Sequence, residues 1–228
     1  MSFVLLLRLS AIRAAAFAFS MLGLMAAAHA IPAFAQFAGP AVGSTTTKVQ
    51  DPAALRPPEG ARVAIVEFED MECPDCRAAN PLLREASEKY HIPWVRHDFP
   101  LSFHAWSFQA AVNARWFDTK GKKVGDEYRD AVFADQPEIA TLADLRTFTE
   151  KFAAQHKLAL PFAIDPQGTL TALVKADFAL GQRVGIEHTP TIWVTTSQSK
   201  GAPFVEVVDR TKLFQLIDQA MADTGAGK

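Results

Sequence analysis

Cysteine is scarce in this chain, whose 228 residues include only Cys73 and Cys76. A domain stapled by disulfides carries several cysteine pairs, so cross-links of that kind cannot be its main source of stability. Structural zinc takes four ligands, and one cysteine pair supplies two of them, while His97 and His104 lie on a different predicted element. We therefore expect no bound metal, and no cofactor beyond a reversible disulfide between Cys73 and Cys76.

Positive charge is in short supply as well. The 23 lysines and arginines are outnumbered by 25 aspartates and glutamates, which gives a formal net charge of −2. Without residues 1–30, which hold two arginines and no acid, the net charge is −4. Domains that bind nucleic acid are usually basic, so that class of partner is disfavoured. With 49% hydrophobic residues, the chain still has enough apolar material for a packed core.

The chain also lacks a long hydrophobic run, although its N-terminus comes close to one. The apolar stretch at 14–28 is about fifteen residues long, whereas a transmembrane helix needs ~20. It follows two arginines and ends in small residues around Ala30, which predicts a secretory signal peptide over residues 1–30. Cleavage after Ala35 and a retained membrane anchor are the alternatives. In each case the folded part is expected outside the cytoplasm, in the periplasm or an equivalent compartment.

The hydrophobic period changes along the rest of the chain. Residues 31–60 are rich in Ala, Pro, Gly and Thr and are predicted to be a flexible N-terminal arm, with a short strand at 45–49. Residues 61–68 are apolar nearly throughout, which predicts a strand buried on both faces, and residues 92–99 are a second strand candidate. A helix is predicted between them, over residues 74–90.

From residue 103 to 185 the apolar residues recur at spacings of three and four, beginning with Phe103, Trp106 and Ala110, which predicts amphipathic helices. Two strands joined by a turn through Gly201 and a C-terminal helix follow.

This order of elements predicts an α/β fold with a mixed sheet and helices on both faces. Residues 61–102 and 186–224 are expected to form its main domain, and residues 103–185 an inserted helical subdomain.

The cysteine pair opens the helix that follows the first predicted strand. Pro74 suits the first helical position, where its missing N–H costs nothing. The free N–H groups and the dipole of a helix N-terminus favour the thiolate of Cys73. A strand, a Cys-x-x-Cys pair and a helix are the layout of a thiol–disulfide redox site. Glu67, six residues before Cys73, is either a structural acid or a proton relay whose pKa is raised by burial.

These features together resemble the thioredoxin-fold superfamily, and within it the DsbA-like branch of exported thiol–disulfide oxidoreductases. The resemblance covers about residues 60–224. It rests on the cysteine pair, on Glu67, and on Thr189-Pro190, which is similar to the cis-proline loop of the family. It implies a thioredoxin fold with a helical insertion, in which Cys73 is the attacked or attacking sulfur and Cys76 the resolving thiol.

The resemblance also implies where a substrate would bind. The loop at Thr189 and Pro190 would offer backbone groups to an extended peptide, beside Pro74 and Asp75 between the cysteines. His188 would lie near the site if this loop forms. Taken alone, Pro190 is equally an ordinary trans-proline at a strand start, and His188 a surface histidine.

The activity implied is disulfide formation in secreted proteins, with reoxidation by a membrane partner of the DsbB or VKOR type. The alternatives are a reductase or isomerase of the same compartment, or a non-catalytic thioredoxin-fold chaperone or binding module. Isomerases of this kind carry a dimerisation domain. Residues 31–60 are too short for one, so a monomer is expected.

Negative charge around the pair bears on the direction of electron flow. Four acids are close to Cys73 in the sequence: Glu69, Asp70, Glu72 and Asp75. Nearby negative charge disfavours a thiolate, and Arg77 offsets only part of it. Asp75 also replaces the histidine that DsbA proteins often carry between the cysteines. We therefore expect a raised pKa for Cys73 and a protein less oxidising than a typical DsbA.

Overall fold

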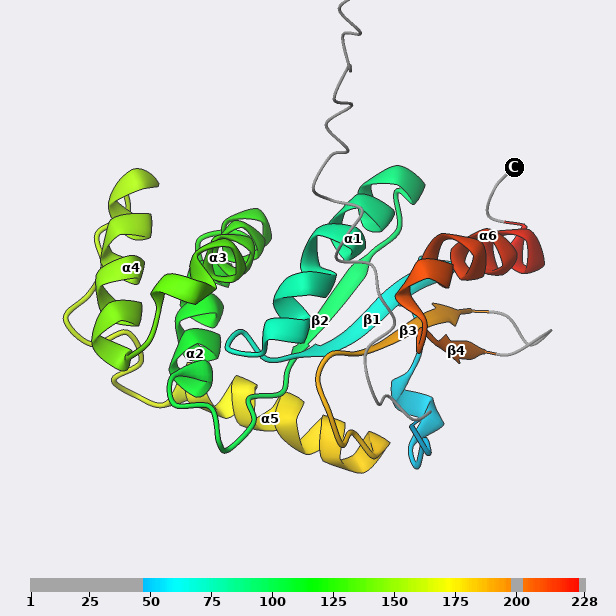
Figure 1. Ribbon diagram of the computed structural model, residues 1–228, viewed down its shortest axis with the longest axis horizontal. Coiled ribbons are helices and arrows are strands. Elements are labelled where there is room, and N and C mark those ends of the chain that lie inside the picture. The colour runs from blue at the N-terminus through cyan, green and yellow to red at the C-terminus, as the bar shows by residue number, and fades with distance from the viewer. Residues whose placement is uncertain (1–46, 198–202, 226–228) are drawn as a thin grey trace, which may run out of the picture. The chain divides into compact units, whose positions relative to one another are not determined.

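The computed structural model describes residues 47–197 and 203–225, and its centre is a four-stranded mixed sheet (Figure 1). The strands, in the spatial order β2-β1-β3-β4, are β1 Val63–Glu69, β2 Trp94–Asp98, β3 Thr191–Thr196 and β4 Phe204–Glu206. Strand β1 pairs parallel with β2 and antiparallel with β3, and β3 pairs antiparallel with β4. The predicted mixed sheet is confirmed.

Both faces of the sheet are covered by helices. The helices are α1 Pro74–Tyr90, α2 Ser107–Asp118, α3 Lys122–Asp135, α4 Leu142–Gln155, α5 Thr169–Val184 and α6 Leu213–Thr224. Alternate residues of β1 point to opposite faces: Ile65 packs with residues of α1 and α6, whereas Phe68 packs with residues of α5. This double cover explains why every residue of β1 is buried. Within the part of the chain described, no helix is long and apolar enough to cross a membrane.

Helices α2 to α5 lie between β2 and β3 in the sequence and build an apolar cluster of their own. In this cluster the rings of Phe117 and Tyr128 stack, and Phe152 packs edge-on against both. The cluster also contains Cys73 and Cys76, which belong to the end of α1 nearest these helices. The redox pair therefore lies at the boundary between the sheet and the helical insertion.

Buried charges cross the same boundary. The guanidinium of Arg96 on β2 binds Glu69 on β1 at 2.8 Å and Asp130 on α3 at 3.0 Å. It also donates to Asn80 on α1 at 3.0 Å. One buried side chain thus connects two strands and two helices. Arg129 of α3 adds a second cation near Glu69, at 3.7 Å.

Two segments differ from the sequence-based expectation. Phe103 is 77% exposed, and α2 begins only at Ser107, because the Glu72 carboxylate accepts the N–H groups of the residues that open it. The expected arm is described from residue 47 onward, where it packs against the domain instead of forming a tether. Leu55 is fully buried, and Gln50 N–H donates to the Val184 carbonyl at 2.9 Å.

Some expectations fall outside the residues described. The predicted signal peptide at 1–30, the arm up to residue 46 and the turn through Gly201 all do so. Of the short strand expected at 45–49, residues 47–49 are described, and they are not in a strand.

The Arg96 cluster predicts a large stability effect. Replacing Arg96 by methionine removes the cation but leaves the Glu69 carboxylate buried, which typically costs about 3–5 kcal/mol. The free energy of unfolding from urea titration should fall by that order. Arg146→Gln is the control, because Arg146 forms an exposed pair with Glu150 and should change it little. Equal effects of the two substitutions would contradict this view of the cluster.

Candidate redox site

The two cysteines lie at the start of α1, just after the carboxyl end of β1. Cys73 is the N-cap residue in an extended conformation, and Pro74 and Asp75 form the first helical turn. Cys76 is fully buried and Cys73 is 7% exposed, while Pro74 and Asp75 between them are exposed. The first sulfur is therefore the one nearer to solvent, and the second is enclosed.

The environment of Cys73 stabilises its thiolate. The thiol of Cys76 hydrogen-bonds to the Cys73 sulfur, and this contact contributes most to lowering the pKa. The backbone N–H groups of Asp75 and Cys76, at the helix N-terminus, and the Thr189 side chain act in the same direction. Burial opposes them, and the net result is a pKa lowered to about 6.

Cys76 has the opposite character. Burial raises its pKa well above the ordinary value, and the neighbouring Cys73 raises it further. The N–H of Asp70 donates to its sulfur at 3.4 Å. Two cysteines three positions apart are thus separated in acidity by their surroundings, which prepares one as thiolate and keeps the other as thiol.

The loop before β3 closes over Cys73. The thiol of Cys73 donates to the Thr189 carbonyl at 3.3 Å, and the Thr189–Pro190 peptide bond is cis. This brings together the cysteine and the loop that the sequence analysis connected only through the resemblance. The His188 ring turns toward Thr191, with Nδ1 3.3 Å from the Thr191 hydroxyl.

Glu67 lies inside the protein on the α1 face of β1. Its carboxylate accepts a hydrogen bond from the indole N–H of Trp94 at 3.0 Å. Burial raises its pKa well above the ordinary value, and the charge of Glu69 adds to this, while Arg96 and the Trp94 hydrogen bond act against it. Its charge also raises the pKa of Cys76. A buried acid is therefore electrostatically coupled to the buried thiol.

The expectation that nearby acids raise the pKa of Cys73 is wrong, because each acid is bound to a partner of its own. The partners are Arg96 for Glu69, His104 for Asp70, the N-terminus of α2 for Glu72 and Arg210 for Asp75. Proximity in the sequence therefore does not translate into unopposed negative charge at the sulfur. Hydrogen bonds to the Cys73 sulfur lower its pKa instead.

Two residues of the site were missed by the sequence analysis. The side-chain amide of Gln136 donates to the carbonyls of Met71 and Cys73 at 2.8 and 3.0 Å. Arg210 donates to the Asp75 carbonyl at 3.1 Å and to its carboxylate at 3.3 Å. They lie 63 and 135 residues from their partners Cys73 and Asp75, in short 3₁₀ turns that match no motif. No signal in the sequence could have found them.

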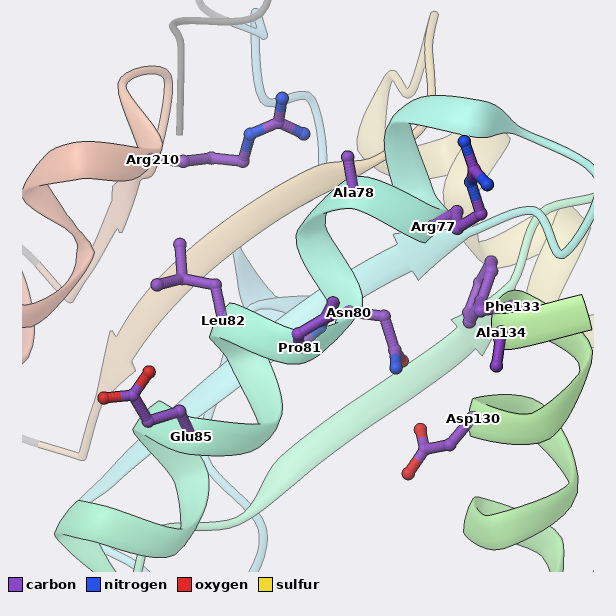
Figure 2. Close-up of a pocket in the computed structure, with 10 residues that line it drawn as sticks. All are labelled: Arg77, Ala78, Asn80, Pro81, Leu82, Glu85, Asp130, Phe133, Ala134 and Arg210. Atoms are coloured by element: carbon purple, nitrogen blue, oxygen red, sulfur yellow. The ribbon is translucent and has the colours of Figure 1, made fainter. Parts of the chain in front are cut away.

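A cleft of about 520 Å³ runs beside the site, between α1 and α3 (Figure 2). Arg77, Asn80 and Pro81 line it from α1, and Asp130 and Phe133 from α3. Neither cysteine lines it. No residue of the Thr189 loop lines it either, whereas Arg210, which binds Asp75, does.

Comparisons with known proteins agree with this geometry. A family model described as Thioredoxin (Thioredoxin_4) matches residues 58–210, so the chain belongs to this thioredoxin family. No curated protein matches the sequence significantly.

The solved structures that the chain resembles include DsbA-type proteins. A variant of alpha-DsbA1 from Wolbachia pipientis is 17% identical with a TM-score of 0.63, over 78% of this chain and 99% of that one. The thiol-disulfide exchange protein alpha-DsbA2 from the same organism is 16% identical with a TM-score of 0.59, over 75% and 91%. DsbA2 from Pseudomonas aeruginosa is 22% identical with a TM-score of 0.52, over 79% and 98%. The chain has a DsbA-like thioredoxin fold.

The site predicts one low thiol pKa in the reduced protein. Titration of the ultraviolet thiolate absorbance should show a midpoint near pH 6. Cys73→Ser should abolish this transition, and Cys76→Ala should raise its midpoint, because the hydrogen bond from Cys76 contributes most to the low pKa. A midpoint at or above that of free cysteine, ~8.5, would contradict the assignment.

The same shift predicts how the stability of the reduced form depends on pH. Because the pKa of Cys73 is lower in the folded chain than in the unfolded one, its contribution to stability is fully present above ~8.5, the pKa of an unfolded cysteine. It is lost as the pH falls through about 6. The oxidised form lacks this titration and serves as the control in the same unfolding series.

Proposed function

We propose that the chain is a thiol–disulfide oxidoreductase that exchanges disulfides with other proteins, acting mainly as a disulfide-forming oxidase. The observation that carries this proposal is the divided acidity of the pair. Cys73 has a pKa lowered to about 6 at a helix N-terminus, and Cys76 has a raised pKa in the interior. This division suits one sulfur to leave as a thiolate and the other to resolve a mixed disulfide.

In the oxidising direction, a substrate thiolate attacks the Cys73 sulfur of the Cys73–Cys76 disulfide. A substrate–Cys73 bond forms, the bond to Cys76 breaks, and Cys76 takes up a proton. The second substrate thiolate then attacks the substrate sulfur in the mixed disulfide, and Cys73 leaves as a thiolate. Two electrons pass from the substrate dithiol to the cysteine pair. Glu67 is proposed to give and take the proton of Cys76, which its burial and its coupling to that thiol support.

The pKa of Cys73 bears on direction. A stabilised thiolate favours the reduced enzyme and hence oxidation of the substrate. A value of about 6 lies between the cysteine pKa of thioredoxin, ~7, and that of DsbA, ~3.5. This intermediate value keeps a reductase or isomerase as the second candidate function.

An extended segment of an unfolded protein is the proposed substrate. The Thr189 carbonyl contacts the Cys73 sulfur, so a peptide bound along the loop at Thr189 and Pro190 would present its sulfur to the site by a form of strand addition. Pro74 and Asp75 are exposed between the cysteines and would border it. His188 is proposed at the rim of the same surface.

The compartment and the redox partner follow from the same proposal. The predicted signal peptide at residues 1–30 supports a periplasmic or otherwise extracytoplasmic location, where disulfides persist. A membrane partner of the DsbB or VKOR type would reoxidise the pair. We propose that the protein acts as a monomer.

Oxidation of a reduced peptide with two thiols, with the protein supplied as its disulfide, tests the proposal. The wild-type chain should convert one peptide per protein, and catalytically when glutathione disulfide is added. Cys73→Ser should lose this activity completely. Cys76→Ser cannot form the disulfide, so it should also fail to oxidise the peptide. Given insulin instead, its Cys73 thiol should attack an insulin disulfide and accumulate a mixed disulfide at Cys73, visible by mass spectrometry, because no Cys76 thiol is present to resolve it. A wild-type chain that neither oxidises the peptide nor reduces insulin would leave a non-catalytic binding module as the function.

The proton role of Glu67 predicts a defect in resolution. Glu67→Gln keeps an acceptor for the Trp94 indole but cannot exchange a proton with Cys76. Reduction of insulin should slow by about tenfold or more, since positioned acid–base groups contribute at least that much. The thiolate titration of Cys73 should change little and serves as the internal control. Unchanged insulin reduction in the variant would make Glu67 a structural acid.

A further inference from the structure

The helical insertion contributes a buried side-chain amide to the turn that carries Cys73. Gln136 lies in the 3₁₀ turn Gln136–Glu138 between α3 and α4, and it is 8% exposed. Its Nε2 is 2.8 Å from the Met71 carbonyl oxygen and 3.0 Å from that of Cys73. An amide nitrogen has two N–H bonds, so the donor capacity of this side chain is fully used by the two carbonyls of the turn.

We propose that Gln136 is a positioning residue of the redox site, which fixes the carbonyls of Met71 and Cys73 and thereby holds the Cys73 sulfur over the N-terminal amides of α1. This inference rests on the proposed function. It assigns a role in disulfide exchange to the helical insertion, through a residue outside the segments that form the sheet.

The first argument is geometric. Cys73 is the N-cap of α1, and the direction of its side chain depends on its own backbone torsions. Its carbonyl accepts the N–H of Arg77 at 3.1 Å as the first bond of the helix, and Gln136 supplies the second donor to the same oxygen. With both lone pairs occupied, the peptide plane after Cys73 is fixed from two sides.

The second argument is electrostatic. The carbonyl oxygens of Met71 and Cys73 carry partial negative charge in the buried turn that holds the thiolate. The Gln136 N–H groups offset this charge in a medium where such interactions are strong. A disulfide carries no charge, so losing these donors should destabilise the reduced thiolate form more than the oxidised one.

The test compares variants in equilibrium with glutathione. Gln136→Met keeps the length of the side chain and removes its donors. The equilibrium should shift about three- to tenfold toward the disulfide, which corresponds to the loss of one or two ordinary hydrogen bonds. The midpoint of the Cys73 thiolate titration should rise as well. The charged side chains around the sulfur stay the same in every variant: Glu67, Asp75, Arg77 and Arg210.

Asn113→Leu is the matched control. Asn113 is another buried amide of the insertion, and it donates to Tyr128 and Thr149 rather than to the redox turn. It should lower the stability of both redox forms and leave the glutathione equilibrium within about twofold of wild type. A purely structural Gln136 would behave in the same way as Asn113.

The outcomes separate this inference from the function it rests on. A wild-type pair that fails to exchange with glutathione overturns both. A wild-type pair that exchanges, with Gln136→Met within about twofold of it, overturns the role of Gln136 alone. If Gln136→Met does not fold, Gln136→Asn replaces it, because the shorter amide cannot reach both carbonyls. The same shift is expected, and its absence overturns the inference.

Discussion

Burial of the turn after β1 is the constraint on which the rest of this structure depends. Residues of the sheet, α1 and the helical insertion enclose it, so the charged and polar groups there face a medium that penalises unpaired charge. Glu69 is bound by Arg96 at 2.8 Å, and Asp70 by His104 at 2.7 Å. These partners bind the acids that would otherwise oppose a thiolate at Cys73.

The same burial separates the two cysteines chemically. Cys73 lies at the helix N-terminus, where donors reach its sulfur, and Cys76 lies one turn further in, where burial dominates. The Cys-x-x-Cys spacing allows the two cysteines to have different surroundings. Three residues are almost one helical turn, so Cys73 lies at the end of α1 and Cys76 lies on its packed face. The division of acidity is therefore a product of helix geometry and the insertion packed against it.

Local features were the ones that the sequence predicted best. The helix over 74–90 follows from Pro74 and the apolar spacing, and α1 has those bounds. The strand at 61–68 follows from a run that is apolar nearly throughout, because a strand covered on both faces needs no polar alternation. The same reasoning was wrong for Phe103. Its spacing from later apolar residues predicts that it belongs to the helix, but Glu72 caps that helix at Ser107.

Long-range polar contacts of the site could not be predicted. The acids near Cys73 are adjacent in the sequence, whereas the partners that neutralise Glu69 and Asp75 are Arg96 and Arg210, on other elements. Gln136 belongs to no motif and to no periodic pattern. A single glutamine between two predicted helices is typical of any exposed turn, so the sequence gives no reason to place it at the site. Only the folded chain shows which of these side chains reaches the redox turn.

The position of the cysteines inside the cluster of the insertion has a consequence for cooperativity. Met71, Cys73 and Cys76 pack with residues of α2 to α5, and Arg96 ties β2 to α3. Separating the sheet from the helical insertion would expose apolar surface and leave a carboxylate without its cation. Local unfolding of either part would therefore destabilise the other. The domain formed by the described residues should therefore unfold as one unit, and a version trimmed to the sheet alone would lack one wall of its own redox centre.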